Sequence, residues 1–225
     1  YGSMQKWKEE NWRTALLIDG ARRVGKSYIA QEFAKKEYKS YILIDFNRAP
    51  AEITDLFVHY LNDLNMFFLY LSNFYGVKLY ERESLIIFDE VQLFPKARAA
   101  IKYLVEDGRY DYVETGSLMT IKKNVADIVI PSEERHMKMY PLDFEEFLWA
   151  KGYSEAHIKD MLKHMKTGIP FSETEMSVYK KLFLEYCVLG GMPAVVNLYI
   201  ETNTFSGTLE LQKQIQLDYE EDIRK

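Results

Sequence analysis

Short, continuous runs of apolar residues alternate in the first half of the chain with longer segments in which apolar residues recur every three or four positions. Runs of the first kind are typical of strands buried on both faces, whereas the second spacing is typical of helices. The runs predict strands at residues 15–19, 40–46, 84–90 and 110–117, and a short fifth strand at 136–142. Because strands and helices alternate, we expect an α/β fold with a parallel sheet covered on both faces.

Helical spacing occupies the segments between these strands and most of the C-terminal part of the chain. The pattern predicts helices at residues 26–36, 51–74 and 96–107. Further along, Asp143 and Glu146 have the spacing of a capping box that opens another helix.

These patterns divide the chain into two parts. We predict an α/β core at residues 4–145 and a smaller helical region at residues 146–225. The final stretch, residues 211–225, is charged and helix-like, and it contains no glycine, proline or turn to end it. We therefore expect a fragment whose helical region is truncated at the C-terminus.

Composition narrows the class of protein. The chain has 225 residues, 48% hydrophobic and 28% charged, and a net charge of −5, which fits a globular protein and argues against a broad nucleic-acid-binding surface. It has one cysteine, Cys187, in an apolar stretch where we expect it to be buried. No apolar run reaches the roughly 18 residues of a membrane span, and no signal-peptide pattern opens the chain, so we expect a cytoplasmic protein without membrane contact. The four histidines, at positions 59, 136, 157 and 164, lack the spacing of metal ligands.

The segment GARRVGKS, residues 20–27, lies between the first predicted strand and the first predicted helix. It matches the phosphate-loop (Walker A) pattern G-x-x-x-x-G-K-[ST] in the context that this motif requires. Its glycines let backbone N–H groups point at phosphate oxygens, Lys26 supplies a cation for the β- and γ-phosphates, and Ser27 is a ligand for Mg²⁺. The predicted nucleotide-binding residues are Gly20, Ala21, Arg22, Arg23, Val24, Gly25, Lys26, Ser27 and Tyr28.

Two arginines stand between the glycines of this loop, and three interpretations stay open for Arg22 and Arg23. They neutralise phosphate charge, or one pairs with an acidic neighbour, or both are solvated.

The third predicted strand ends in two carboxylates, Asp89 and Glu90. An apolar strand that ends in Asp is what a Mg²⁺ site opposite a phosphate loop needs, so we assign Asp89 to the metal. Glu90 follows, where it can orient or deprotonate an attacking water. We predict Glu90 and Lys26 as the catalytic residues, and Thr115 and Ser117, at the polar end of the fourth strand, as candidate sensors of the γ-phosphate.

Five segments, LLIDGARRVGKS, LIIFDEVQ, ETGS, YPLDFEEFL and YCVLGGMPAVV, occur in this order. Together they resemble the AAA-type ATPases of bacteria and archaea that carry an uncharacterised C-terminal domain, over roughly residues 15–225. The resemblance implies a P-loop NTPase core of the AAA+-like, additional-strand catalytic-Glu type, a small helical lid, and ATP/ADP with Mg²⁺ as cofactors. Residues 40–46 come between the two motifs in the sequence, so a sheet with the strand order of that type would place them as an extra strand between the two motif strands, with 110–117 next.

One feature of that family is altered here. Its members often carry a Gly-Arg pair shortly before the Pro-Leu segment, and that arginine is a candidate finger or sensor. The nearest arginine is Arg135, but Glu134 replaces the glycine and the spacing is short. We favour a surface arginine in an acidic loop over a carry-over of the role.

Three classes of function are compatible with these motifs. The first is an ATPase module that drives or gates an unknown partner activity; the second is a nucleotide-gated binding module with negligible hydrolysis; the third is a P-loop kinase. Glu90 directly after Asp89 favours the first, because water is then the acceptor, whereas a kinase must exclude water. The nucleotide is the predicted partner, and a homo-oligomer and a DNA or protein partner are compatible with the sequence.

Overall fold

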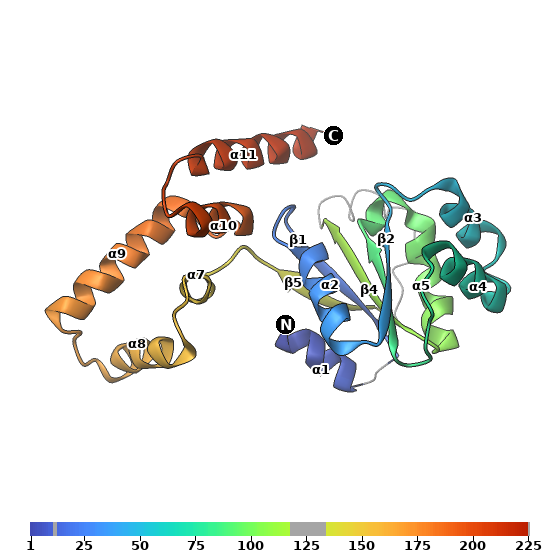
Figure 1. Cartoon of the computed structure of the whole chain (residues 1–225), viewed down its shortest axis with the longest axis horizontal. Coiled ribbons are helices and arrows are strands. Elements are labelled where there is room, and N and C mark those ends of the chain that lie inside the picture. The colour runs from blue at the N-terminus through green and yellow to red at the C-terminus, as the bar shows by residue number, and fades with distance from the viewer. Residues whose placement is uncertain (11–12, 118–133, 225) are drawn as a thin grey trace. The chain divides into compact units, whose positions relative to one another are not determined.

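The computed structural model describes residues 1–10, 13–117 and 134–224 (Figure 1). The chain forms two compact units, Tyr1–Ala21 with Gly25–Met139, and Arg22–Val24 with Tyr140–Lys225. The predicted boundary between residues 145 and 146 falls inside a helix, Phe144–Ala150.

The first unit alternates strands with helices. Its elements are α1 (Gly2–Glu10), β1 (Ala15–Gly20), α2 (Lys26–Glu37), β2 (Ser40–Asp45), α3 (Ala51–His59), α4 (Leu64–Tyr75), β3 (Ser84–Asp89), a 3₁₀ turn η1 (Val91–Leu93), α5 (Pro95–Asp107), β4 (Asp111–Ser117) and β5 (Glu134–Met139). The fifth strand begins two residues before the predicted segment and ends before Pro141, which lacks the N–H that a strand interior needs.

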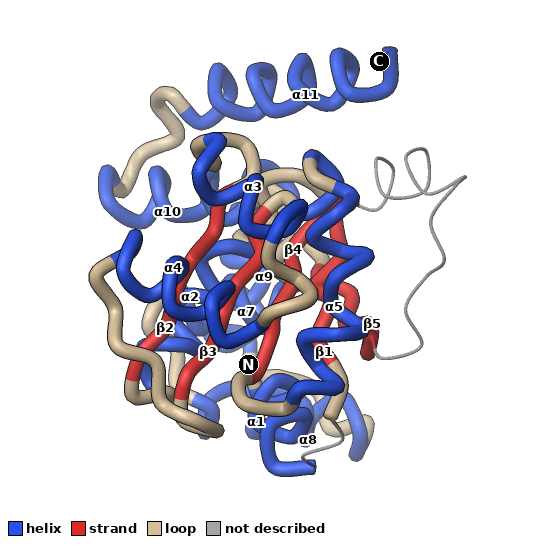
Figure 2. Tube along the Cα trace, turned by 90° about the vertical axis from the view of Figure 1, so that its right-hand side faces the viewer, coloured by secondary structure: helices blue, strands red, loops and turns tan. Residues whose placement is uncertain are grey.

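All five strands are parallel and form one sheet in the order β2-β3-β4-β1-β5 (Figure 2). The predicted parallel α/β core is therefore confirmed. One detail was wrong: the strand between β1 and β3 is β4, whereas β2 (the predicted 40–46) lies at the edge, beside β3. The order in which strands pair is not the order in which they occur along the chain.

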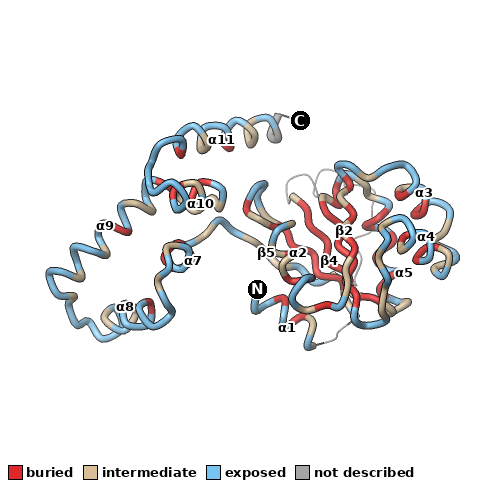
Figure 3. The backbone as a smooth tube through the Cα atoms, viewed as in Figure 1, coloured by how far each residue is buried: buried red, intermediate tan, exposed pale blue. Residues whose placement is uncertain are grey.

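Each face of the sheet has its own apolar core. Figure 3 shows that the strands between these cores are largely buried. On one face, helices α3, α4 and α5 cover side chains such as Ile86 and Phe88. On the other, α1 and α2 cover Leu16, Ile18 and Val113. This double coverage explains why the strands read as continuous apolar runs. The N-terminal helix α1, which the sequence pattern did not predict, contributes buried Met4 and Trp7 to the second core.

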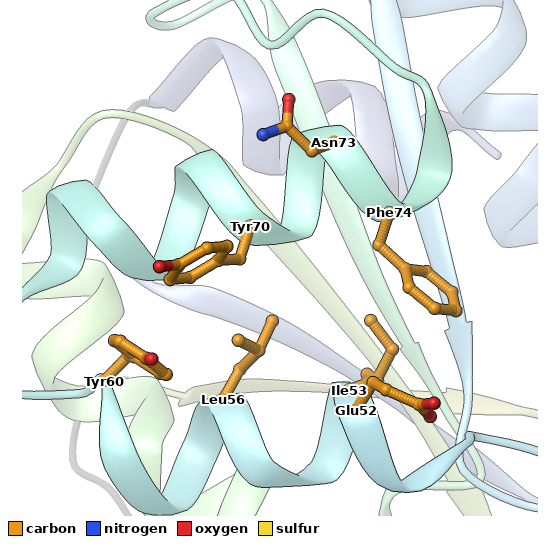
Figure 4. Close-up of a pocket in the computed structure, with 7 residues that line it drawn as sticks. All are labelled: Glu52, Ile53, Leu56, Tyr60, Tyr70, Asn73 and Phe74. Atoms are coloured by element: carbon orange, nitrogen blue, oxygen red, sulfur yellow. The ribbon is translucent and has the colours of Figure 1, made fainter.

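The predicted single helix at residues 51–74 is two helices, α3 and α4. The Asp63 side chain accepts a hydrogen bond from Met66 N at 3.2 Å and caps the start of α4, so a new helix begins there. The two helices then fold against each other, and the rings of Tyr60 and Tyr70 meet edge to face at 5.0 Å. Figure 4 shows Leu56 of α3 and Phe74 of α4 in the shallow pocket between them.

The second unit is helical. Its helices are α7 (Phe144–Ala150), α8 (Glu155–Thr167), α9 (Glu173–Leu189), α10 (Pro193–Thr202) and α11 (Thr208–Arg224). The capping box predicted at Asp143 and Glu146 is present. No helix in the described parts of the chain is long and apolar enough to cross a lipid bilayer.

Cys187 lies on α9 and is exposed, so the prediction of a buried cysteine was wrong. Only Leu182 and Leu189 of α9 are buried, because a single side of this helix packs into the apolar cluster of the unit. The apolar neighbours that suggested burial, Phe183, Leu184 and Val188, are exposed as well.

Candidate functional site

The phosphate loop runs from the end of β1 to the start of α2, and its two glycines meet different needs. At Gly20 a Cβ atom would lie 2.2 Å from the carbonyl oxygen of Met139 in β5, so no side chain fits between the strands there. Gly25 has φ of 93° and ψ of 19°, a left-handed conformation that glycine adopts without strain, and it caps α2. The N-terminus of α2 is thereby aimed at the loop, where backbone N–H groups and the helix dipole attract anions.

Lys26 is the first residue of α2 and is 5% exposed. Its Nζ donates hydrogen bonds to two carbonyl oxygens of the loop, Gly20 O at 3.2 Å and Ala21 O at 2.8 Å. The Lys26 ammonium group therefore lies against the backbone of the phosphate loop. A phosphate oxygen offers it a charge-assisted hydrogen bond, which is stronger than one to a neutral carbonyl.

Ser27 and Asp89 meet although 62 positions separate them in the sequence. Ser27 Oγ donates to Asp89 Oδ1 at 2.6 Å, and Thr115 Oγ1 donates to the same oxygen. Thr115 reaches Asp89 because β4 lies directly beside β3. A hydroxyl and a carboxylate at the C-terminal edge of a parallel sheet, next to a phosphate loop, are the protein ligands that Mg²⁺ takes in P-loop NTPases.

Glu90 has a positive φ of 55° and ψ of 44°, which is uncommon for a residue with a side chain. Its backbone N–H donates to Thr115 Oγ1 at 3.3 Å, and the Gln92 side-chain amide donates to its Oε2. These bonds hold the left-handed turn and orient the carboxylate. Gln92 lies two residues after Glu90 in LIIFDEVQ, but the motif alone predicts no role for it.

The other residues that the sequence predicted for the site differ in their place in the fold and in their exposure. Ser117 is the last residue of β4 and lies opposite Gly20 in the strand register, and Tyr28 is 69% exposed. Arg22 and Arg23 are exposed, whereas Val24 is buried. Arg135 lies in β5, so the acidic loop expected around it was wrong, and its guanidinium pairs with Glu10 of α1.

A parallel α/β sheet in which a phosphate-loop serine meets the aspartate of a second strand defines a P-loop nucleotide-binding protein. The chain belongs to the AAA domain family, whose model matches residues 13–148. The AAA-type resemblance inferred from the sequence motifs is confirmed.

Three proteins that this chain resembles are distant from it in sequence. An uncharacterised protein of Methanocaldococcus jannaschii is 21% identical over 213 aligned residues, which cover 80% of this chain; the chain spans 43% of that relative's length. Among solved structures, a STAND signal-transduction ATPase with a tetratricopeptide repeat sensor from Pyrococcus horikoshii has a TM-score of 0.47 and 12% identity, with 94% of this chain and 31% of that chain covered. The Aeropyrum pernix ORC1 protein, solved in complex with DNA, has a TM-score of 0.41 and 12% identity; the match covers 65% of this chain and 46% of the ORC1 chain.

A buried ionic cluster lies between α5 and the strands, and sequence reasoning missed it. Arg98 of α5 forms a bidentate pair with Glu134 of β5, at 3.0 Å from Nε to Oε1 and 2.8 Å from Nη2 to Oε2. Glu114 of β4 is fully buried beside this pair. Burial, and then the neighbouring Glu134 carboxylate, raise the pKa of Glu114 well above its usual range, so folding favours the protonated form of Glu114.

We expect Glu114→Gln to stabilise the protein at neutral pH relative to the wild type, and the advantage to shrink as the pH falls. The native state holds the Glu114 proton more tightly than the unfolded chain does. The wild type therefore loses stability as the pH rises above the ordinary Glu pKa of about 4.3, at up to about 1.4 kcal/mol per pH unit, until the raised pKa is passed. Glutamine has no such proton to lose.

Urea unfolding of both proteins from about pH 5 to about pH 8 measures this difference. Glu106→Gln is the control, because it removes an exposed carboxylate of α5 and leaves the buried cluster intact. A difference between Glu114→Gln and the wild type that stays constant with pH would contradict the raised pKa of Glu114.

Proposed function

We propose that this chain is an ATPase module that binds Mg²⁺-ATP, hydrolyses it, and thereby drives or gates the activity of a partner. The observation that carries the proposal is the contact between Ser27 Oγ and Asp89 Oδ1 at 2.6 Å, which joins the phosphate-loop motif to the Asp-Glu motif. Two motifs that are separately common in sequences rarely converge on one point by chance.

The residues present suit Mg²⁺-ATP. Lys26 and the N-terminal N–H groups of α2 would bind the β- and γ-phosphates, and Ser27 with Asp89 would hold the metal ion. Bound there, Mg²⁺ neutralises charge on the phosphate oxygens. Thr115 donates to Asp89 and so fixes the carboxylate orientation. In the proposed hydrolysis, the Glu90 carboxylate accepts a proton from the attacking water.

A second candidate, nucleotide-gated binding with negligible hydrolysis, is favoured by the contact between Gln92 and Glu90. The Gln92 amide donates to Glu90 Oε2 and so occupies one of the two carboxylate oxygens that would take the proton. In that case the module would bind ATP tightly and turn it over slowly, until a partner or a second copy of the chain displaced Gln92.

Phosphate release from ATP, measured with Mg²⁺ and without any other acceptor, tests the proposal. We expect release by the wild type, and loss of Mg²⁺-dependent release in Asp89→Ala, because the metal loses its carboxylate. Asp45→Ala is the matched control. Asp45 is the last residue of the neighbouring strand β2, and its Oδ1 accepts a hydrogen bond from Asn47 N at 2.9 Å. Release that is independent of Mg²⁺, or equal in wild type and Asp89→Ala, would overturn the proposed site; ATP binding without release would favour the second candidate.

The second part of this proposal concerns the partner of the ATPase module. The chain spans 43% of the length of the Methanocaldococcus jannaschii protein. We propose assembly into a homo-oligomer, in which an arginine from a second copy completes the site, and action on a DNA or protein partner in the cytoplasm. The rate of ATP turnover per chain, measured over a series of protein concentrations with and without DNA, tests the assembly and the DNA partner. A rate per chain that rises with protein concentration supports assembly, and a rate that rises when DNA is added supports a DNA partner.

A further inference from the structure

Helices α8 and α9 bring three ionisable side chains together in the second unit. Asp160 and His164 are four residues apart on α8, so they lie on one side of that helix. Glu175 comes from the first turn of α9. One carboxylate oxygen of Asp160, one of Glu175 and a ring nitrogen of His164 all lie within 4.8 Å of one another.

His164 is held in a defined orientation by groups outside this trio. Its Nδ1 lies 3.1 Å from Ile169 O, and since a carbonyl oxygen only accepts, Nδ1 carries the hydrogen. Its ring stacks on Phe171, with centroids 4.7 Å apart and the planes 29° apart. In the neutral imidazole, Nε2 is then left with its lone pair. Histidine ligands of metals almost always donate their other nitrogen in this way, often to a backbone carbonyl, which fixes the tautomer.

Glu175 is oriented as well. Its Oε2 accepts from Ser172 N at 2.8 Å and from Ser172 Oγ at 2.7 Å, which completes the capping box of α9. These bonds occupy one carboxylate oxygen and leave Oε1 for another partner. Two of the three side chains are thus positioned before anything binds, which lowers the entropic cost of binding.

The three groups are not simply an ion-paired cluster. Among the described residues, His164 forms no ion pair within 4.0 Å with Asp160 or Glu175, unlike the Lys159–Glu155 pair on the same helix at 3.1 Å. Ligand atoms that share one cation at about 2.0–2.2 Å each must stand apart from one another by more than a hydrogen bond. The spacing suits a bridging cation after a small side-chain adjustment.

We propose that Asp160, His164 and Glu175 bind one divalent transition-metal ion, with Zn²⁺ as the preferred ion. An imidazole selects against Mg²⁺ and Ca²⁺, which prefer oxygen ligands only, and two carboxylates with one imidazole suit Zn²⁺. Water completes the coordination. The ion joins the C-terminal half of α8 to the first turn of α9, so it braces the connection between these helices. This site shares no residue with the nucleotide site and does not depend on ATP hydrolysis.

Isothermal titration of the metal-free chain with ZnCl₂, in a large excess of Mg²⁺ that occupies oxygen-only sites, tests the proposal. We expect one Zn²⁺ per chain in the wild type. Asp160→Asn and His164→Gln should each weaken binding at least tenfold. Asp160 is exposed, so Asp160→Asn preserves the fold even where His164→Gln disturbs the stacking on Phe171.

His157→Gln and Glu173→Gln remove a matched imidazole and carboxylate from the same two helices, outside the trio, and should bind Zn²⁺ like the wild type. Co²⁺ gives an independent readout, since its visible absorption should appear in the wild type and both controls and be lost in Asp160→Asn. Absence of Zn²⁺ binding by the wild type, or equal affinity in the wild type and Asp160→Asn, overturns the site.

Discussion

Lys26→Ala is expected to weaken ATP binding by about 100-fold or more. A hydrogen bond to a charged group contributes about 1.5–3 kcal/mol, and the Lys26 ammonium has three donors beside the phosphate loop. The alanine variant keeps the backbone N–H groups of the loop but loses the cation. Because hydrogen bonds to Gly20 O and Ala21 O are lost as well, the loop also becomes less well ordered before binding.

Equilibrium binding of a fluorescent ATP analogue measures the effect, with circular dichroism to show that the buried substitution leaves the fold intact. Lys35→Ala and Lys36→Ala, on exposed positions of the same helix, remove the same charge away from the loop and should bind like the wild type. Unchanged affinity in a folded Lys26→Ala protein would falsify the assignment of the phosphate loop.

Glu90→Gln is expected to separate binding from chemistry. The amide keeps the size of the side chain but accepts a proton poorly, and general-base catalysis contributes typically 10²–10⁴-fold. Turnover should therefore fall by about 100-fold or more, whereas ATP affinity should stay close to that of the wild type. The left-handed backbone of Glu90 is held by Thr115 through the main-chain N–H, which the substitution leaves in place.

Single-turnover hydrolysis with enzyme in excess is the suitable measurement, because it reports the chemical step even when product release is slow. Glu83→Gln, an exposed position directly before β3, is the control and should hydrolyse ATP at the wild-type rate. If Glu90→Gln matches the wild type, Glu90 is only a charged residue at a strand end, and the base lies elsewhere.

The sequence by itself determined the parts of this protein whose causes are local. The spacing of Gly20, Gly25 and Lys26 is typical of a phosphate loop, so it predicted a tight loop between strand and helix at residues 20–27. Strands β1 and β3 were recognisable because a strand covered on both faces is apolar at most of its positions. The capping boxes lie within four consecutive residues, so the one at Asp143 could be predicted too.

The tertiary structure decided what depends on residues far apart in the chain. Strand pairing is non-local, so only the fold shows that β4 lies between β1 and β3, and with it the contact of Thr115 with Asp89. A long helical pattern does not say where a chain folds back, which is why α3 and α4 were predicted as one helix. The Arg98–Glu134 pair, the buried Glu114 with its raised pKa and the approach of Glu175 to His164 arise in the same way. Local spacing encodes turns, caps and faces, whereas the pairing of charges across the fold is set only when packing excludes water from between them.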